Sequence, residues 1–356
     1  MVLVLFMLSG LRGASAADAG STPVPTPLPP APRELRIVSY NTYNFQPLSR
    51  PQIKSPESRD MVIAILANLS PDIAVLTEVG GQDGLNEIVD LLKKTGVAYP
   101  FSSLVQGEDL ERNIAVISKI APVRVQHDTA SIYNLGGRAT RVQRGFAHLV
   151  FKWDNGYTLH LLGAHLKSKM FDARGQTDMR RYEARLLRYA VNKILAADPK
   201  AHVLVVGDFN DTPDSSPVNT LCDRRAPIAR QLFDLRPVDH NNLAWTQLQE
   251  EADTYSRIDY AMASYSLLPE IVYEKTLIPP IADWYIASDH RPLLITLVPE
   301  DKPMQADILN KFQRNSRLAE IPVSFFHDGP VVGTRKARKG TPAPKTAGGA
   351  VTGDSE

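Results

Sequence analysis

Six short polar clusters, each joined to an apolar run, occur between residues 40 and 290 of this 356-residue chain. No stretch rich in Pro, Gly or Ser separates them, so the sequence predicts that one domain carries all six. We expect each cluster to lie where an apolar strand ends, because side chains at strand ends reach into a shared cleft and loops on a rigid scaffold commonly carry function. The clusters are Tyr40-Asn41, Thr77-Glu78-Val79, His165-Leu166-Lys167-Ser168, Gly207-Asp208-Phe209-Asn210, Arg257-Ile258-Asp259-Tyr260 and Ser288-Asp289-His290.

The apolar runs alternate with stretches of helical periodicity. Asp154-Asn155-Gly156 lies between two apolar runs and is typical of a hairpin turn. Strands followed by helices, with hairpins among them, predict an α/β fold in which two β-sheets pack together and helices lie outside. We expect strands at 35–40, 73–77, 114–118, 146–153, 158–164, 203–206, 258–263 and 293–297, and helices at 58–69, 85–94 and 175–197.

Composition limits the classes of protein that remain. The apolar fraction of 43% is enough for a sizeable core. A formal net charge of +1 excludes a strongly basic coat for nucleic acid but permits a local basic groove. Cys222 is the single cysteine, so no intrachain disulfide can form.

The two ends of the chain differ in composition from the middle. Residues 1–8 are apolar and Ala14-Ser15-Ala16 is a small-residue cleavage site, so we predict a signal peptide over 1–16 and a secreted or periplasmic protein. No Lys or Arg precedes the apolar run, and a frayed hydrophobic terminus is the alternative. We assign 17–33 to a Pro/Ala-rich linker, 34–300 to the domain and 301–356 to an extension that is disordered from about 335.

In order and spacing, the six clusters resemble the endonuclease/exonuclease/phosphatase superfamily, and the resemblance covers about residues 35 to 298. It implies a four-layered α/β sandwich, with two mixed β-sheets flanked by helices, and a metal-dependent phosphodiesterase. Carried over to this sequence, Glu78 is the principal metal carboxylate, with Asn41 and Asp289 nearby. Oxygen ligands of this kind suit Mg²⁺ or Mn²⁺.

The same resemblance implies catalytic roles for five residues. Asp208 aligns or deprotonates the attacking water, and Asn210 holds a phosphate oxygen. His290 lies beside the scissile phosphate, and Asp259 orients its ring. His165 contacts the phosphate from the other side.

Elementary chemistry agrees with these roles. A metal, two imidazoles and an amide can stabilise the charge that grows on a phosphodiester in the transition state. A carboxylate paired with an imidazole raises the pKa of the ring, which favours a cation beside the phosphate. We expect His290 and Asp259 to line an open cleft. For His165 the alternative is a core histidine, but Lys167 and Lys169 follow it and favour an anionic site.

Several further polar residues are candidates for substrate binding. Asn113 resembles a phosphate-contacting asparagine of some superfamily members, and Arg144 precedes the next strand. A basic rim for a polyanion would explain the arginines and lysines near the clusters, whereas strand-edge polar residues and a solvated basic loop are the alternatives. The members of this rim are Arg138, Arg141, Arg144, Lys167 and Lys169.

The sequence thus predicts an exported Mg²⁺- or Mn²⁺-dependent hydrolase of phosphodiester bonds, with nucleic acid, DNA or RNA, as its substrate. The alternative enzyme is a phosphatase or phosphodiesterase of a small or lipid phosphate, sphingomyelinase-like or inositol-phosphate-like. A non-catalytic binding module is the third hypothesis, but none of the metal and catalytic groups is missing. We expect a monomer with no stable membrane insertion once the signal peptide is removed.

Overall fold

Side chains along β1 (Leu35–Phe45) alternate between two apolar layers. Leu35 and Ile37 lie in the central core, whereas Val38 and Tyr40 lie in a second core on the other face of the sheet. Strands covered on both faces read as continuous apolar runs, which explains the pattern seen in the sequence. The computed structural model describes residues 27–51, 54–308 and 310. The predicted signal peptide, most of the linker and most of the C-terminal extension lie outside the described residues.

The first large sheet has five strands in the order β15-β1-β2-β4-β3. β1 and β2 are parallel, and the other pairs are antiparallel, so the sheet is mixed. The other four strands are β2 (Ile73–Val79), β3 (Phe101–Val105), β4 (Asn113–Ser118) and β15 (Leu293–Leu297).

The second large sheet has six strands in the order β11-β14-β10-β9-β8-β5. β9 and β10 are parallel, and the predicted hairpin of β8 and β9 is confirmed. The strands are β5 (Arg124–Val125), β8 (Phe146–Lys152), β9 (Thr158–His165), β10 (His202–Asp208), β11 (Leu232–Asp234) and β14 (Asp259–Ser264).

The two sheets pack face to face through the central core. Gly163 of β9 lies against Val75 of β2, and a Cβ atom at Gly163 would come within 2.7 Å of the Val75 side chain. The missing side chain therefore lets the sheets approach closely at this point.

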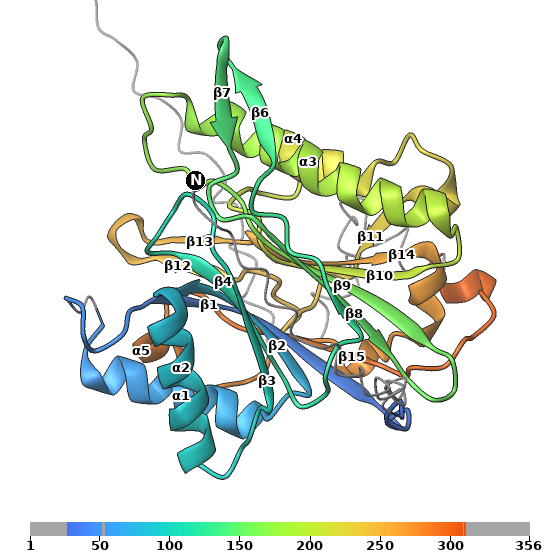
Figure 1. Ribbon diagram of the computed structural model, residues 1–356, viewed down its shortest axis with the longest axis horizontal. Helices are drawn as coiled ribbons and strands as arrows, with labels where there is room; N and C mark the ends of the chain where they lie inside the picture. The colour runs from blue at the N-terminus through green and yellow to red at the C-terminus, as the bar shows by residue number, and fades with distance from the viewer. Residues whose placement is uncertain (1–26, 52–53, 309, 311–356) are drawn as a thin grey trace, which may run out of the picture. The chain divides into compact units, whose positions relative to one another are not determined.

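Helices cover the outer face of each sheet (Figure 1). α1 begins after Ser55, whose side chain accepts a hydrogen bond from the Ser58 N–H, and this cap places the start two residues before the predicted one. The four-layered α/β sandwich is confirmed. The five-stranded sheet is covered by α1 (Pro56–Leu69), α2 (Gly81–Lys94) and α5 (Trp284–Ala287), and the six-stranded sheet by α3 (Gln176–Ala197) and α4 (Ser216–Cys222).

Two small hairpins and four 3₁₀ turns were not predicted, because segments this short carry little periodicity. The hairpin strands and turns are β6 (Ile132–Leu135), β7 (Arg138–Arg141), β12 (Gln247–Gln249), β13 (Thr254–Ser256), η1 (Ile228–Arg230), η2 (Glu250–Ala252), η3 (Tyr265–Glu270) and η4 (Tyr273–Lys275).

Within the described ranges no helix is long and apolar enough to cross a membrane.

Candidate active site

Strand register in the six-stranded sheet aligns three of the predicted residues. The last residue of β10, Asp208, pairs with His165 at the end of the parallel strand β9 and with Asp259 on the antiparallel strand β14. We expected each cluster to follow the end of a strand, and for Asp259 this is wrong, since β14 begins there. An antiparallel strand begins where its neighbour ends, so the three side chains still share one edge of the sheet.

Gly207 makes this edge possible. Its φ of +136° lies in the region that side-chain-bearing residues rarely adopt, and a Cβ atom would come within 1.9 Å of the Ala164 carbonyl oxygen. Glycine is therefore required at position 207, because the backbones of β9 and β10 approach too closely there for a side chain.

The five-stranded sheet contributes Asn41 and Glu78 from β1 and β2. Both strand pairs of β2 shift register near Glu78, and Glu78 itself has a left-handed backbone with φ of +63°. Such bulges re-aim side chains and recur beside active sites. The Asn44 N–H donates to Glu78 Oε2 at 3.0 Å, which holds the carboxylate in place.

The two sets of residues meet at Asp208 Oδ2. The amide nitrogen of Asn41 donates to this oxygen at 3.0 Å, and the Nε2 atoms of His165 and His290 lie 3.6 and 3.9 Å from it. The same Asn41 nitrogen lies 3.3 Å from Glu78 Oε1. Side chains from both sheets, far apart in sequence, thus converge on a single carboxylate oxygen.

His290 is held on two sides. Its Nδ1 lies 2.7 Å from Asp259 Oδ2, and its backbone N–H donates to Ser288 Oγ at 3.0 Å. Burial by itself lowers the pKa of His290, but the charge of Asp259, supported by Asp289 and Asp208, outweighs it and raises the pKa well above the ordinary value. The ring is therefore a cation at neutral pH, as predicted for an imidazole paired with a carboxylate.

His165 has the opposite character. Burial and the positive charge of Arg144 hold its pKa well below the ordinary value, so the ring is neutral. Its Nδ1 is buried without a hydrogen-bond partner among the described residues. The other ring nitrogen, Nε2, faces the Glu78 and Asp208 carboxylates at 3.8 and 3.6 Å.

Asp208 has an unusual pKa for a carboxyl group. Burial first and then the nearby charge of Asp259 raise it to about 7. The Asn210 N–H donates to Asp208 Oδ1 at 2.8 Å, which fixes the orientation of the group. A carboxyl group that titrates near neutral pH can accept and release a proton.

Comparison with known proteins identifies this arrangement. The sequence profile described as the Endonuclease/Exonuclease/phosphatase family matches residues 38–290, which include every residue described above. The chain belongs to this family. It is therefore a hydrolase of the endonuclease/exonuclease/phosphatase superfamily.

Solved structures of the family share the fold at low sequence identity. An endonuclease/exonuclease/phosphatase from Beutenbergia cavernae has a TM-score of 0.55 at 16% identity, covering 77% of this chain and 74% of its own. The human Nocturnin catalytic domain has a TM-score of 0.53 at 15% identity, with coverages of 74% and 94%. Sphingomyelinase C from Streptomyces griseocarneus has a TM-score of 0.51 at 16% identity, with coverages of 74% and 99%. A comparison with curated proteins found no match.

The carboxylates fit the divalent cation on which enzymes of this family generally depend. Among the residues that the structure describes, Asp289 Oδ1 is buried without a hydrogen-bond partner, although His290 Nε2 lies 3.9 Å away, and its Oδ2 accepts from Gln247 Nε2 at 3.2 Å. A hard cation satisfies such an oxygen. Asn41 is oriented differently, because its Oδ1 accepts from the Tyr43 N–H and its nitrogen faces Glu78. Its place as a ligand stays a prediction.

An alternative metal set at the same place is less suitable. Ligand atoms of Asp208, Asp259 and His290 all lie within 4.8 Å of one another. However, the hydrogen bond between Asp259 and His290 Nδ1 already occupies two of them. A cation at that point would have to break the pair that orients the ring.

The predicted substrate-binding residues are tied to the protein itself. Asn113 donates from Nδ2 to the Val79 carbonyl at 3.1 Å, and Arg144 donates to the Leu166 carbonyl at 3.1 Å and to Asp109 at 3.2 Å. Both are buried, and Lys167 pairs with Asp172 at 3.3 Å. Arg144 and Lys167 still act on the site through their charge, since both lower the pKa of His165. Their contact with substrate remains a prediction.

The Asn210 side chain also uses part of its hydrogen-bonding capacity within the protein. Its Nδ2 donates to the Leu166 carbonyl at 2.9 Å, beside the bond from Arg144. An amide nitrogen carries two hydrogens, so one remains for a phosphate oxygen. Its φ of +53° is a left-handed conformation that asparagine tolerates.

Sequence reasoning missed three residues that support the site. Thr246 Oγ1 accepts hydrogen bonds from the N–H groups of Ile258 and Asp259, and Gln247 holds Asp289. Ser288 Oγ bridges the Asn41 carbonyl and the His290 N–H. Only Ser288 had a signal, as the first residue of the Ser-Asp-His cluster, because the Thr246 and Gln247 contacts depend on tertiary approach.

Proposed function

We propose that this protein hydrolyses phosphodiester bonds with Mg²⁺ or Mn²⁺ held by Glu78 and Asp289, with Asn41 beside them. The observation that carries this is the pairing of Asp208 with His290, whose Oδ2 and Nε2 atoms lie 3.9 Å apart. The pKa of each group is raised, so one can accept a proton near neutral pH while the other carries a positive charge. Hydrolysis of a phosphodiester needs both.

Each side chain then has one task. Asp208 takes the proton of the attacking water, and the free amide hydrogen of Asn210 binds a phosphate oxygen. Asp259 holds His290 Nδ1, so the Nε2–H of the cation faces the phosphate. The bound cation supplies Lewis-acid stabilisation of the charge on the phosphate.

His165 acts as a neutral hydrogen-bonding group. Its ring lies beside Glu78 and Asp208, with Nε2 at 3.8 and 3.6 Å from their carboxylates. A second imidazolium here would repel His290, whose charge is one of the causes that lower the pKa of His165. One cationic and one neutral imidazole therefore face the phosphate.

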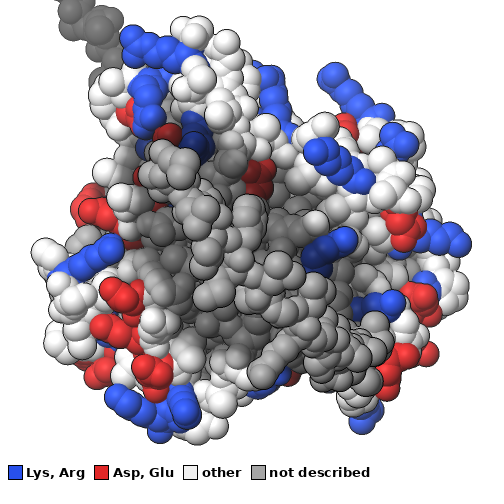
Figure 2. Space-filling model, viewed as in Figure 1, with Lys and Arg blue, Asp and Glu red and all other residues white. Residues whose placement is uncertain are grey.

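Nucleic acid is the substrate that we propose first. Arg138 and Arg141 are exposed on the β6–β7 hairpin, which projects from the domain (Figure 1). Figure 2 shows several basic side chains around this projection, with a few acidic ones beside them. A local basic hairpin can contact a phosphate backbone that extends beyond the cleft.

A lipid phosphate is the second candidate. Met170 and Phe171 are 74% and 85% exposed, although both are large and apolar. They follow Lys167 and Lys169 in the loop after β9, whose last residue is His165. Exposed apolar residues beside basic ones are typical of a surface that meets a membrane interface.

One assay decides between the two candidates. We would incubate the purified protein with Mg²⁺ or Mn²⁺ and with plasmid DNA, RNA, sphingomyelin vesicles and inositol phosphates, using Asp208→Asn as the inactive control. Hydrolysis of nucleic acid that weakens in the double variant Arg138→Ala/Arg141→Ala, but not in Met170→Ala/Phe171→Ala, supports the first candidate. The reverse pattern on vesicles supports the second. Hydrolysis of none of these substrates contradicts the proposal.

Export is part of the same proposal. Its support is the apolar stretch at residues 1–8 and the small residues Ala14-Ser15-Ala16. The mature chain would then begin near Ala17. Mass spectrometry of the secreted or periplasmic fraction tests this, and a cytoplasmic protein that retains Met1 contradicts it.

A further inference from the structure

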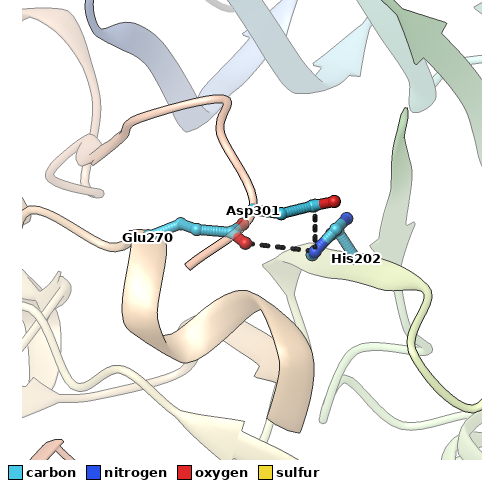
Figure 3. Close-up of side chains that lie close together, drawn as sticks. All are labelled: His202, Glu270 and Asp301. Carbon is cyan, nitrogen blue, oxygen red and sulfur yellow. Dashed lines mark ion pairs between the residues drawn. The ribbon is translucent and has the colours of Figure 1, made fainter. Parts of the chain in front are cut away.

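A second cluster of metal-binding side chains lies at the other end of β10. His202 is the first residue of that strand and Asp208 the last, so six steps of roughly 3.3 Å put the two about 20 Å apart. The Nε2 atom of His202 lies 3.1 Å from Glu270 Oε1 and 3.4 Å from Asp301 Oδ1. Figure 3 shows both carboxylates directed at this ring from separate chain segments.

The other ring nitrogen fixes which atom is available. His202 Nδ1 lies 3.2 Å from the Thr158 carbonyl oxygen, which can only accept a hydrogen bond. Nδ1 therefore carries a hydrogen. Nε2 donates a hydrogen of its own to Glu270 unless a metal ion replaces that hydrogen and takes the lone pair of Nε2. The ring also stacks on Tyr157, with centroids 4.5 Å apart. Histidine ligands of metals are commonly oriented by such a bond from the other ring nitrogen.

Glu270 is positioned in the same way. The residue is 1% exposed, and the Tyr157 hydroxyl donates to its Oε2. Its Oε1 is buried, and in the described part of the chain only the His202 ring lies within hydrogen-bonding reach of it. A buried carboxylate is costly unless a cation lies against it, and here that cation is either the His202 imidazolium or a metal ion that takes the place of its Nε2 hydrogen.

Backbone contacts bring the third group into place. The Val298 N–H donates to the Glu270 carbonyl at 2.9 Å, which ties the segment after β15 to the end of η3 and leads to Asp301. Lys200 and Lys302 line the same cavity of about 870 Å³, but within the described residues neither forms an ion pair with the two carboxylates. A lysine therefore does not neutralise these carboxylates, which leaves the His202 ring or a metal ion.

We propose that His202, Glu270 and Asp301 bind a divalent transition-metal ion, with Zn²⁺ as the best match. One imidazole nitrogen and two carboxylate oxygens form a ligand set that Zn²⁺ and Mn²⁺ accept, whereas Mg²⁺ and Ca²⁺ prefer oxygen alone. Three protein ligands leave at least one position for water, and the adjoining cavity has room for it. A proton shared between His202 and Glu270 is the other way to balance the charge.

A metal at this point would join three segments of the chain. β10, η3 and the stretch after β15 each supply one ligand. Because an ion that binds only the folded state stabilises it, Zn²⁺ should raise the melting temperature. In a Glu78→Gln protein, where the principal carboxylate of the cleft is removed, Mg²⁺ at the same concentration should not reproduce this rise.

The test measures metal binding in the full-length protein after chelation and dialysis. We would titrate Zn²⁺ calorimetrically into a Glu78→Gln background, which removes the principal carboxylate of the cleft. Asp301→Asn is the main variant because this side chain is 82% exposed and its change leaves packing intact. The matched control is Glu300→Gln, an exposed neighbour that loses the same charge.

We expect the Glu78→Gln protein to bind one Zn²⁺, and Asp301→Asn to weaken this binding by at least about tenfold, the lower end for loss of a supporting group at a metal site. Glu300→Gln should bind as tightly as its parent, and His202→Gln should abolish binding. No uptake of Zn²⁺ by Glu78→Gln, or equal affinity in Asp301→Asn and Glu300→Gln, would overturn the site in favour of a shared proton. Hydrolysis by the wild-type protein is scored separately, so failure of either proposal leaves the other intact.

Discussion

The two ends of β10 carry similar side chains and differ in what holds the histidine. At the catalytic end a carboxylate, Asp259, binds His290 Nδ1, whereas at the other end a neutral carbonyl, that of Thr158, binds His202 Nδ1. The carboxylates therefore take different ring nitrogens. In His290 the Nε2–H is left to face the cleft, whereas the Glu270 and Asp301 carboxylates face Nε2 of His202, the atom that a metal ion would bind. The two sets are Asp208, Asp259 and His290, and His202, Glu270 and Asp301.

The largest expected effect is the loss of hydrolysis on metal removal, and it distinguishes the two ends of β10 by the metal that each one binds. Chelation with EDTA should abolish hydrolysis, Mg²⁺ or Mn²⁺ should restore it, and Glu78→Gln should remain inactive because the cleft loses its principal carboxylate. In the chelated Glu78→Gln protein, Zn²⁺, not Mg²⁺, should raise the melting temperature. Steady-state kinetics on the wild-type protein and thermal melts on the variant measure the two effects. Full activity in excess EDTA would remove the metal from the reaction.

Removing the catalytic imidazole should be nearly as severe. His290→Ala should lower kcat by at least about 10²-fold, the lower end for a positioned acid–base group. His240→Ala is the matched control, since this ring is exposed. A folded His290→Ala protein with wild-type kcat would exclude His290 from the reaction.

The hydrogen bond behind that ring predicts non-additive losses. Asp259→Asn should lower kcat by a similar order, and the double variant with His290→Ala should be little worse than the worse single one, because the two act as a unit. Fully additive losses would show that Asp259 acts independently of His290.

Stability should change as well. We expected an open cleft, and this is wrong for the pair itself, since Asp259 and His290 are only 4% and 3% exposed. Asp259→Asn should therefore also cost about 1–3 kcal/mol in free energy of unfolding, the range for weakening a buried hydrogen bond to a charged group. Denaturant titration measures it.

At the His202 end of β10, the largest expected effect of a substitution is on the free energy of unfolding. Tyr157→Phe removes the hydroxyl that donates to Glu270 Oε2 and should lower the free energy of unfolding by about 1–3 kcal/mol, because a buried acceptor loses its donor. The same variant should weaken Zn²⁺ binding if the bond orients Glu270. Unchanged denaturant midpoint and unchanged Zn²⁺ affinity would contradict the supporting role of Tyr157.

The smallest effect concerns a histidine that has no carboxylate behind it. Burial and the neighbouring His160 lower the pKa of His148 to about 4. The unfolded chain takes up the proton first, so stability should fall as pH drops from about 6.5 to about 4, by roughly 1–2 kcal/mol after allowance for partial exposure. In His148→Gln, the denaturant midpoint should change less with pH across this range than in the wild-type protein. An equal slope in both proteins would exclude His148 as the cause.

The fold class and the family could be predicted from the amino-acid sequence, and both predictions are confirmed. Apolar runs covered on both faces, interrupted by helical periodicity, leave few architectures other than packed sheets with outer helices. The ordered clusters around Asn41, Glu78 and Asp208 carry a local signal, because polar groups must lie beside the strands that position them.

The protonation of the buried histidines and the position of the second cluster depend on tertiary structure. The low pKa of His165 depends on burial and on Arg144, and the support of Asp259 by Thr246 depends on a hairpin that local sequence does not reveal. His202 and Glu270 lie 68 positions apart in sequence and lack any motif. Burial and long-range charge act through space, so they are set by which strands pair and pack, and a linear pattern of residues does not record them.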